Sequence, residues 1–334
     1  MSKPIGVGII GLGFMGRIHL AGYRFAAEQG CPCSVVALCD ESSARIDDTF
    51  ATMSVEHRAR FAPDPARCQD VDTFLKAPAM NLVSICTHTD THIDLAMRAL
   101  QAGKHVLLEK PVAIRSAEVA RLCGMAAKSD RICLPAMCMR FWPGWTWLRE
   151  RVVDRRYGAL QSAVFSRLGS APQWTPFYAD FSRSGGALFD LHIHDADFVR
   201  WLFGEPLEVT STGSPTHLTT IFRFENAGHV VAEGGWLASG FPFRMRYIAS
   251  FESATADFDS LRTQPLLVTH EALTVPVPIE PWTGWDAEIA HMLELVGGRE
   301  QPPAVTLDDA LAVTRILEAE AISLRTGRPV ELRK

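Results

Sequence analysis

The first 135 residues alternate between short apolar runs and longer amphipathic stretches. The apolar runs have the length and composition of buried strands, and they cover residues 5–10, 34–39, 81–86, 104–108 and 131–134. In the segments 90–102 and 116–129, apolar residues recur at helical spacing. Because strands and helices alternate, this part of the chain is predicted to form a parallel sheet connected by right-handed β-α-β crossovers.

The pattern changes after residue 140. A helical segment at 142–156 is followed by stretches in which apolar and polar residues alternate with the period of an antiparallel strand; these are 159–168, 217–225, 228–237 and 243–252. Helical spacing returns at 187–203, 285–297 and 307–325. The second part of the chain is therefore predicted to be α+β, with a large, mostly antiparallel open sheet.

The composition is that of an ordinary globular protein and excludes several classes. Of 334 residues, 47% are hydrophobic and 21% are charged, and the formal net charge is −5. This balance favours neither nucleic acid nor an anionic membrane surface as a partner. The N-terminal segment lacks the apolar core of a signal peptide, and no uncharged apolar stretch approaches the roughly 18 residues of a transmembrane helix. We therefore expect a cytoplasmic protein.

Eight cysteines lie within the first 138 residues, several of them inside the apolar runs. Buried thiols explain these positions better than disulfides do. Cys31 and Cys33 lack a second pair at zinc-ligand spacing. We therefore predict no metal site among the cysteines.

A glycine-rich segment, GLGFMG at residues 11–16, follows the first predicted strand and opens the first helix. In this position the first glycine permits a tight turn, and the second lets the backbone approach a pyrophosphate. The third lets helix and strand pack closely. A glycine turn without a ligand has the same spacing. The acid at the end of the next strand, Asp40, favours a dinucleotide site.

A carboxylate at the position of Asp40 can accept hydrogen bonds from both ribose hydroxyls and repels a 2′-phosphate. The sequence therefore favours NAD over NADP. Two alternatives stay open: Arg45 could bind a 2′-phosphate, and Asp40 could cap the next helix.

The fifth predicted strand ends on Glu109-Lys110-Pro111. Ligands bind at the carboxyl ends of parallel strands, and a lysine there can stabilise negative charge on a reacting oxygen. The proline favours an extended conformation for Lys110. A surface lysine before a turn is the alternative interpretation.

Residues 184–197, SGGALFDLHIHDAD, form the second candidate cluster. On an α-helix, Asp190 and His194 are four residues apart and share a face. A histidine beside a carboxylate suits general acid–base catalysis, because imidazole titrates near neutral pH. Asp190 could instead cap the helix above a buried His194. A metal site is a further alternative, but His192 and His194 diverge on a helix, so we predict no metal.

Together these motifs resemble the glucose–fructose oxidoreductase/inositol dehydrogenase (Gfo/Idh/MocA) family along nearly the whole chain. The resemblance rests on GLGFMG, on residues 85–111 ending in EKP, on MRFWP at 139–143, and on residues 184–204 with their Gly-Gly, Asp and His. It implies an NAD(P)-binding Rossmann domain at 1–135 and a substrate and oligomerisation α+β domain at 136–334. The last helices can pack back on the first domain. The open sheet commonly forms the interface of a homodimer or homotetramer in this family.

The resemblance also implies the site. The catalytic residues map onto Lys110, Asp190 and His194, with the histidine as proton donor or acceptor. Cofactor contacts map onto Gly11, Gly13, Phe14, Met15, Gly16, Asp40, Thr87, His88, His92, Glu109 and Lys110. Two positions depart from the pattern: His88 replaces a usual proline near the nicotinamide, and His192 replaces a frequent glycine, so that its side chain is expected in the substrate pocket.

Further substrate contacts are expected from Arg140 of the MRFWP motif and from the loop before the two glycines. In that loop Trp174 and Tyr178 offer aromatic faces to a sugar ring, and Arg183 suits an acidic substituent. The function predicted from the sequence is hydride transfer between NAD and a hydroxyl or carbonyl carbon of a sugar, inositol or related polyol. The alternatives are a glycosidase that oxidises its substrate transiently with NAD and a non-catalytic sugar or dinucleotide sensor.

Overall fold

The structure is a computed structural model that describes residues 4–52, 64–77 and 79–332. The chain divides into two compact units. The first is built from the residues up to 113 together with 117–138 and 283–310, and the second from 114–116, 139–282 and the residues from 311 onward. Within the described ranges, no helix is long and apolar enough to span a bilayer.

The first unit contains a six-stranded parallel sheet in the order β3-β2-β1-β4-β5-β6. Its central strands are buried on both faces, as β-branched runs such as Val7 and Ile9 predict. The short edge strand β3 was not predicted, because its three residues include only one buried side chain. The strands are β1 Ile5–Ile10, β2 Cys33–Cys39, β3 Ala66–Cys68, β4 Met80–Ile85, β5 His105–Glu109 and β6 Cys133–Ala136.

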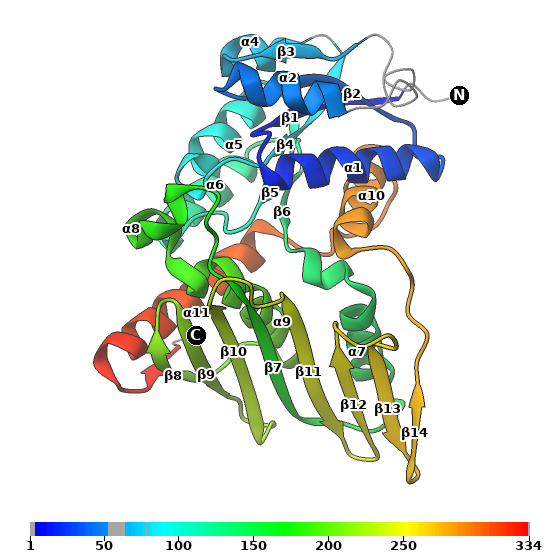
Figure 1. Cartoon of the computed structure of the whole chain (residues 1–334), viewed down its shortest axis with the longest axis vertical. Coiled ribbons are helices and arrows are strands. Elements are labelled where there is room, and N and C mark those ends of the chain that lie inside the picture. Colours follow the sequence, from blue (N-terminus) through cyan, green and yellow to red (C-terminus); the bar gives the residue numbers. More distant parts are fainter. Residues whose placement is uncertain (1–3, 53–63, 78, 333–334) are drawn as a thin grey trace. The chain divides into compact units, whose positions relative to one another are not determined.

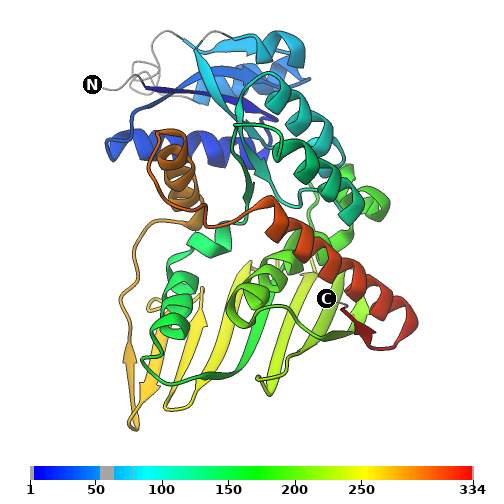
Figure 2. The same cartoon turned by 180° about the vertical axis from the view of Figure 1, so that it is seen from behind.

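Helices cover both faces of this sheet, with α1 and α10 on one side and α5 and α6 on the other (Figures 1 and 2). Helix α10 comes from the C-terminal part of the chain but belongs to the first unit. The helices are α1 Phe14–Glu28, α2 Ser43–Thr52, α4 Val71–Leu75, the 3-10 turn Thr89–Thr91, α5 His92–Gln101, α6 Ser116–Ala126 and α10 Gly284–Val296.

The second unit contains a nine-stranded sheet in the order β14-β13-β12-β11-β7-β10-β9-β8-β15. All neighbouring strands are antiparallel except β7 and β10. The predicted mostly antiparallel sheet is therefore confirmed. The strands are β7 Leu160–Ser170, β8 Glu208–Ser214, β9 His217–Arg223, β10 His229–Leu237, β11 Arg244–Phe251, β12 Ala254–Asp259, β13 Leu266–His270, β14 Leu273–Pro276 and β15 Val330–Glu331.

One face of this sheet is covered by α7, α9 and α11, which lie in front of the strands in Figure 2. The opposite face is open toward the viewer in Figure 1. Beneath the helices, the indole of Trp145 packs edge-on against Tyr247 and Phe258, with ring centroids 5.3 and 4.5 Å away. The helical segments are the 3-10 turn Cys138–Phe141, α7 Pro143–Asp154, the 3-10 turn Pro176–Ala179, α8 Phe181–Ser184, a π-helical turn Leu188–His192, α9 Ile193–Phe203 and α11 Leu307–Thr326.

Candidate functional site

The glycine turn between β1 and α1 has the geometry that a dinucleotide requires. Gly11 has a φ of 87°, and a side chain there would collide with the backbone of Cys86. A side chain on Gly16 would collide with the carbonyl oxygen of Gly11. By contrast, a Cβ on Gly13 would meet no atom within 4 Å. The backbone at the start of α1 is therefore open to a pyrophosphate, whereas the other two glycines close the turn.

Asp40 lies directly behind this turn. Its Oδ2 accepts a 2.8 Å hydrogen bond from the backbone N–H of Leu12, and its Oδ1 accepts one of 2.9 Å from Ser42. The guanidinium of Arg45 lies 3.5 Å from the same carboxylate. Asp40 does not cap α2, because that helix begins at Ser43 and Ser42 accepts the N–H of Arg45. The acid and the glycine turn therefore form one unit, with Arg45 already paired.

The imidazole of His92 lies between two backbone carbonyl groups. Its ring is only 1% exposed, with Nδ1 2.9 Å from the Pro111 carbonyl oxygen and Nε2 3.1 Å from that of Thr87. Burial lowers the pKa of His92, so the imidazole is neutral. His92 thus joins the segment after β4 to the segment after β5, and its contact with a cofactor stays a prediction. His88 remains exposed.

Glu109 is also turned inward, and its contact with a cofactor stays a prediction. One carboxylate oxygen lies 2.9 Å from His19 Nε2, and the other accepts a 3.0 Å hydrogen bond from the backbone N–H of Lys110. His19 continues to the hydroxyl of Ser84 at 3.1 Å, and Ser84 to that of Tyr23 at 2.7 Å. This buried network fixes the backbone at Lys110, whose side chain is half-buried at the end of β5.

The segment 184–204 departs from the regular α-helix that its sequence predicts. Residues Leu188–His192 form a π-helical turn before α9 begins. Asp190 therefore lies in the π turn, whereas His194 lies in the first turn of α9. Its position is set by Trp236 on β10, whose indole N–H donates a 3.3 Å hydrogen bond to Asp190 Oδ2. Single π turns are frequent at functional sites.

Three other ionisable residues of this segment are held in buried ion pairs. His192 Nε2 lies 2.9 Å from Glu320 of α11. Asp195 accepts two 2.9 Å hydrogen bonds from Arg167. These pairs occupy side chains that a metal would need. Asp190 is half-buried and His194 is 9% exposed.

The remaining pair joins Asp197 to Arg140, with hydrogen bonds of 2.6 and 2.9 Å. Both side chains are almost completely buried. Arg140 was expected to bind substrate, and His192 to enter the substrate pocket. In the structure His192 is fully buried and Arg140 pairs with an internal carboxylate, and both substrate contacts stay predictions. Asp190 and His194 belong to the same segment, and Asp190 contacts the indole of Trp236.

The loop before the two glycines brings its aromatic residues together. Trp174 is 68% exposed, and its ring centroid lies 5.7 Å from that of Tyr178. The guanidinium of Arg183 lies over the ring of Phe177. Trp236 was missed by sequence reasoning, because nothing in an alternating strand marks the one indole that faces a carboxylate 46 residues earlier.

Lys110 lies in the first unit, and Asp190 and His194 lie in the second. Residues 5–137 match the model of an oxidoreductase family with an NAD-binding Rossmann fold, and residues 145–255 match the GFO/IDH/MocA C-terminal domain. The two matches follow each other in the order expected from the motifs. They cover the parallel sheet and the first five strands of the open sheet, together with part of β12.

Named relatives share this region. The chain is 30% identical to an inositol 2-dehydrogenase of Rhizobium meliloti over 210 residues, which cover 62% of this chain and 58% of the relative. It is 28% identical to a D-glucoside 3-dehydrogenase of Escherichia coli over 208 residues, covering 61% and 56%. The matches thus span less than two-thirds of the length of either relative.

Among solved structures, a levoglucosan dehydrogenase in complex with NADH and levoglucosan is similar, with a TM-score of 0.84. The identity is 20%, and the match covers 99% of this chain and 100% of the other. At this identity the likeness concerns the fold of both units.

Proposed function

Because the chain belongs to the Gfo/Idh/MocA oxidoreductase family with its NAD-binding Rossmann fold, we propose that it transfers a hydride between NAD and a CH–OH or carbonyl carbon of a sugar, inositol or related polyol. The observation that carries this proposal is that a carboxylate and an imidazole, Asp190 and His194, stand in the segment matched by the C-terminal domain of the family. These two groups are suited to proton transfer. His192, Asp195 and Asp197 of the same segment form buried ion pairs.

NAD is the cofactor of this family, and the Rossmann unit fits it. The open backbone at Gly13 and the turn closed by Gly11 and Gly16 suit a pyrophosphate. We propose that Asp40 exchanges one of its backbone hydrogen bonds for ribose hydroxyls. The carboxylate of Asp40, with Arg45 3.5 Å away, repels a 2′-phosphate, which supports NAD over NADP.

The proposed mechanism transfers one proton and one hydride from the substrate. In the oxidative direction, neutral His194 takes the hydroxyl proton while the hydride leaves the same carbon, and a carbonyl group results. NAD, when bound, accepts that hydride. Lys110 stabilises the negative charge that develops on the oxygen. Asp190, held by the indole of Trp236, binds a substrate hydroxyl and orients the reacting carbon.

The test is a panel of inositols, aldoses and methyl glycosides, assayed for NADH formation with NAD and with NADP. Wild-type enzyme is expected to reduce NAD with at least one polyol, and His194→Asn to lose that activity. His270→Asn, which replaces a histidine at the end of β13, serves as the matched control. Tight NAD binding without any NADH formation would instead favour the sensor. Glycoside cleavage without net NADH would favour the glycosidase.

We further propose that the open face of the nine-stranded sheet forms a homo-oligomer interface. Four apolar side chains face one another across neighbouring strands, in the order Ile221, Val231, Val164, Ile248. Ile221, Val164 and Ile248 are 53%, 39% and 42% exposed. A continuous exposed apolar row of this kind is typical of an interface.

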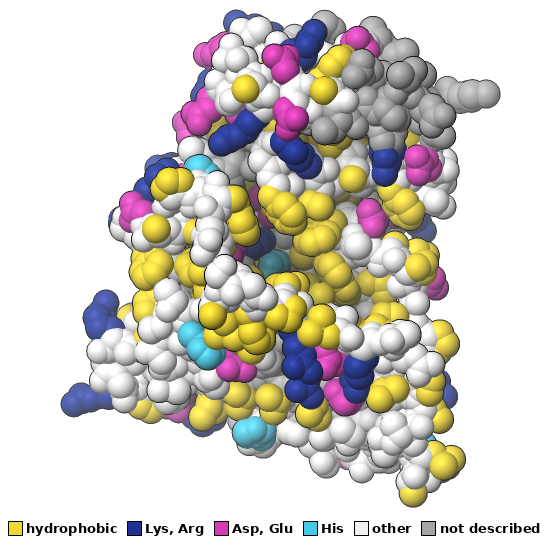
Figure 3. Space-filling view, viewed as in Figure 1, with side chains coloured by type: hydrophobic (Ala, Val, Ile, Leu, Met, Phe, Trp, Pro, Cys, Tyr) yellow, Lys and Arg dark blue, Asp and Glu magenta, His cyan; other side chains and the backbone are white. Residues whose placement is uncertain are grey.

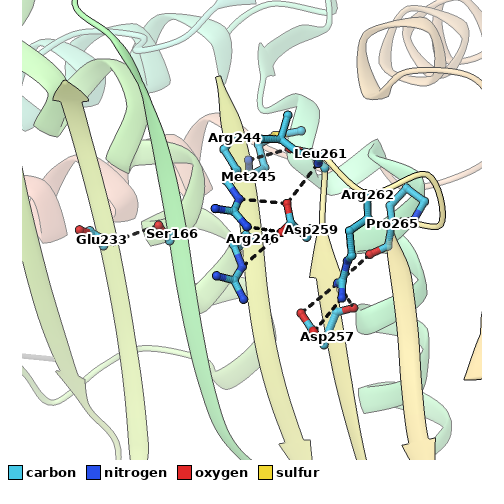
Figure 4. A network of polar contacts seen from close by, with 11 residues as sticks. Ser166, Glu233, Arg244, Met245, Arg246, Asp257, Asp259, Leu261, Arg262 and Pro265 are labelled. Carbon is cyan, nitrogen blue, oxygen red and sulfur yellow. Dashed lines mark hydrogen bonds and ion pairs between the residues drawn. The ribbon is translucent and has the colours of Figure 1, made fainter. Parts of the chain in front are cut away.

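A row of polar residues runs beside this apolar row (Figure 4). Ser166 donates a 3.0 Å hydrogen bond to Glu233, and Asp259 pairs with Arg244 and lies 3.7 Å from Arg246. Figure 3 shows dark blue and magenta side chains next to one another on the open face. Because Asp259 is paired with two arginines of the same chain, covering the face does not leave this carboxylate unpaired.

Light scattering coupled to size exclusion tests this interface. Ile248→Asp is expected to reduce the oligomer to a smaller species, because it buries an unpaired charge within the interface, at one end of the row. Val153→Asp replaces a side chain that is 66% exposed on α7 and should leave the mass unchanged. A monomeric wild type, or an unchanged mass for Ile248→Asp, would contradict the proposal.

A further inference from the structure

A chain of aromatic rings leads away from the carboxylate of Asp190 within the second unit. It begins with Trp236, which donates its indole N–H to Asp190. The ring of Tyr178 stands edge-on to Trp236 at a centroid distance of 5.9 Å, and Trp174 follows edge-on to Tyr178 at 5.7 Å. Phe181 flanks Trp236 at 6.3 Å. We call Trp174, Tyr178, Phe181 and Trp236 the aromatic wall.

The outer part of the aromatic wall is exposed. Trp174 is 68% and Phe181 is 43% exposed, although each could bury a large apolar surface. Large apolar side chains that gather on a surface mark a site that something covers. Tyr178 and Trp236 are partly buried and connect these exposed rings to Asp190.

Local hydrogen bonds hold the loop that carries the wall. Thr175 caps the turn at Phe177, and Asp180 accepts from the backbone N–H and the hydroxyl of Ser182. The hydroxyl of Ser184 donates to the carbonyl of Tyr178 and accepts from the N–H of the second glycine. The rings are therefore preorganised, so a ligand that stacks on them does not have to order the loop first.

The wall continues beyond the indole that contacts Asp190. Two ring-to-ring steps, of 5.9 and 5.7 Å between centroids, lead from Trp236 to Trp174. The nearby carboxylate of Asp180 is occupied by Ser182, and the Arg183 guanidinium lies over Phe177. The surface beyond the reacting ring is thus built of π faces and edges, which suit a neutral ring with an apolar face.

We propose that the aromatic wall binds a second ring, joined to the ring whose hydroxyl Asp190 holds. The substrate class is then a glycoside with an aryl aglycone or a second pyranose, and neither a free inositol nor a monosaccharide fills the site. This inference rests on the proposed function, because it assumes that Asp190 binds the reacting polyol. The shared chemistry of the two candidate rings is an apolar face for stacking.

Matched glycosides test the wall. KM and kcat are measured with NAD for the methyl and phenyl glycosides of glucose and galactose, in both anomers, and for cellobiose, maltose and lactose. The phenyl glycoside or the disaccharide is expected to have a KM about tenfold or more below that of its methyl counterpart, since one stacked ring contributes about 1.4 kcal/mol or more. If the phenyl glycosides have the lower KM, the second ring is an aryl aglycone, and if the disaccharides do, it is a pyranose.

Trp174→Ala should raise KM for the preferred two-ring substrate about tenfold, and so bring the ratio of this KM to that of the methyl glycoside close to one. Trp147→Ala is the matched control. It removes a partly buried tryptophan whose neighbours, Tyr157 and Arg151, lie outside the loop. The ratio of its KM for the two-ring substrate to its KM for the methyl glycoside should equal that of the wild type.

Several results would overturn the inference while the proposed function stands. One is an equal KM for both members of every pair. Another is turnover of inositols or aldoses alone. A third is a Trp174→Ala variant with an unchanged KM ratio but a smaller mass in light scattering, which would make the wall an interface between copies of the chain. If no compound yields NADH at all, the proposed function itself has failed, and the two failures are thereby distinguished.

Discussion

Replacing Asp195 by asparagine should destabilise the protein by about 3 kcal/mol, because it leaves a buried guanidinium without a counter-charge. Arg167 donates two hydrogen bonds of 2.9 Å to this carboxylate, and the two side chains are only 2% and 1% exposed. Asparagine has nearly the same volume and can still accept one of these bonds, so the loss is chiefly electrostatic. It is a large fraction of the stability of an ordinary protein.

Urea unfolding followed by circular dichroism measures this loss of stability. The effect on catalysis is measured as kcat with a polyol from the panel. Asp48→Asn removes an exposed partner of Arg17 and should leave the unfolding midpoint nearly unchanged. Asp190→Asn should do the opposite of Asp195→Asn, with nearly normal stability and a greatly reduced kcat. A stable Asp195→Asn variant with lowered turnover would refute the separation of structural and chemical residues in this helix.

Three further changes extend the account. Trp236→Phe removes the indole N–H that holds Asp190 and should lower kcat severalfold without changing the Kd for NAD. Steady-state kinetics measure kcat and calorimetry measures Kd. An unchanged kcat would show that this hydrogen bond does not position Asp190. Asp40→Ala should lower the preference for NAD over NADP about tenfold or more in kcat/KM, because it removes the carboxylate that repels a 2′-phosphate; an unchanged ratio would move cofactor selection elsewhere. Burial alone would lower the pKa of His192, but the carboxylate of Glu320 raises it above its usual value. The pair therefore stabilises the fold fully below the unfolded-state pKa of about 6.5. This stabilisation is lost as the pH rises through the folded-state pKa. Unfolding across this range should therefore depend on pH less in His192→Gln than in the wild type, and an identical dependence would contradict the pairing.

Much of the fold followed from periodicity. The buried runs of the first unit and the long alternating strands of the second are the features that hydrophobic spacing reports most directly. The family and the NAD cofactor inferred from the motifs are confirmed by the matches to both of its models. Strands β8, β12, β13 and β14 were not predicted. For β14, all four residues are exposed, so apolar alternation gives no signal.

The site was predictable only in part, because the partner of a polar residue is set by tertiary structure. Glu320 reaches His192 from a helix more than a hundred residues further along the chain, and local sequence cannot show that. The same holds for Arg140 and Asp197, which read as a substrate contact and a helical acid but form one buried pair. The π turn at Asp190 also has no signature in the pattern of apolar residues.

The turnover of His194→Asn with the best polyol of the panel, measured beside its affinity for NAD, tests the central claim most directly. The account predicts a kcat lowered about a hundredfold or more, with an NAD Kd within about twofold of the wild-type value, because the residue moves a proton and does not contact the glycine turn. A variant that oxidises the polyol at the wild-type rate would contradict it.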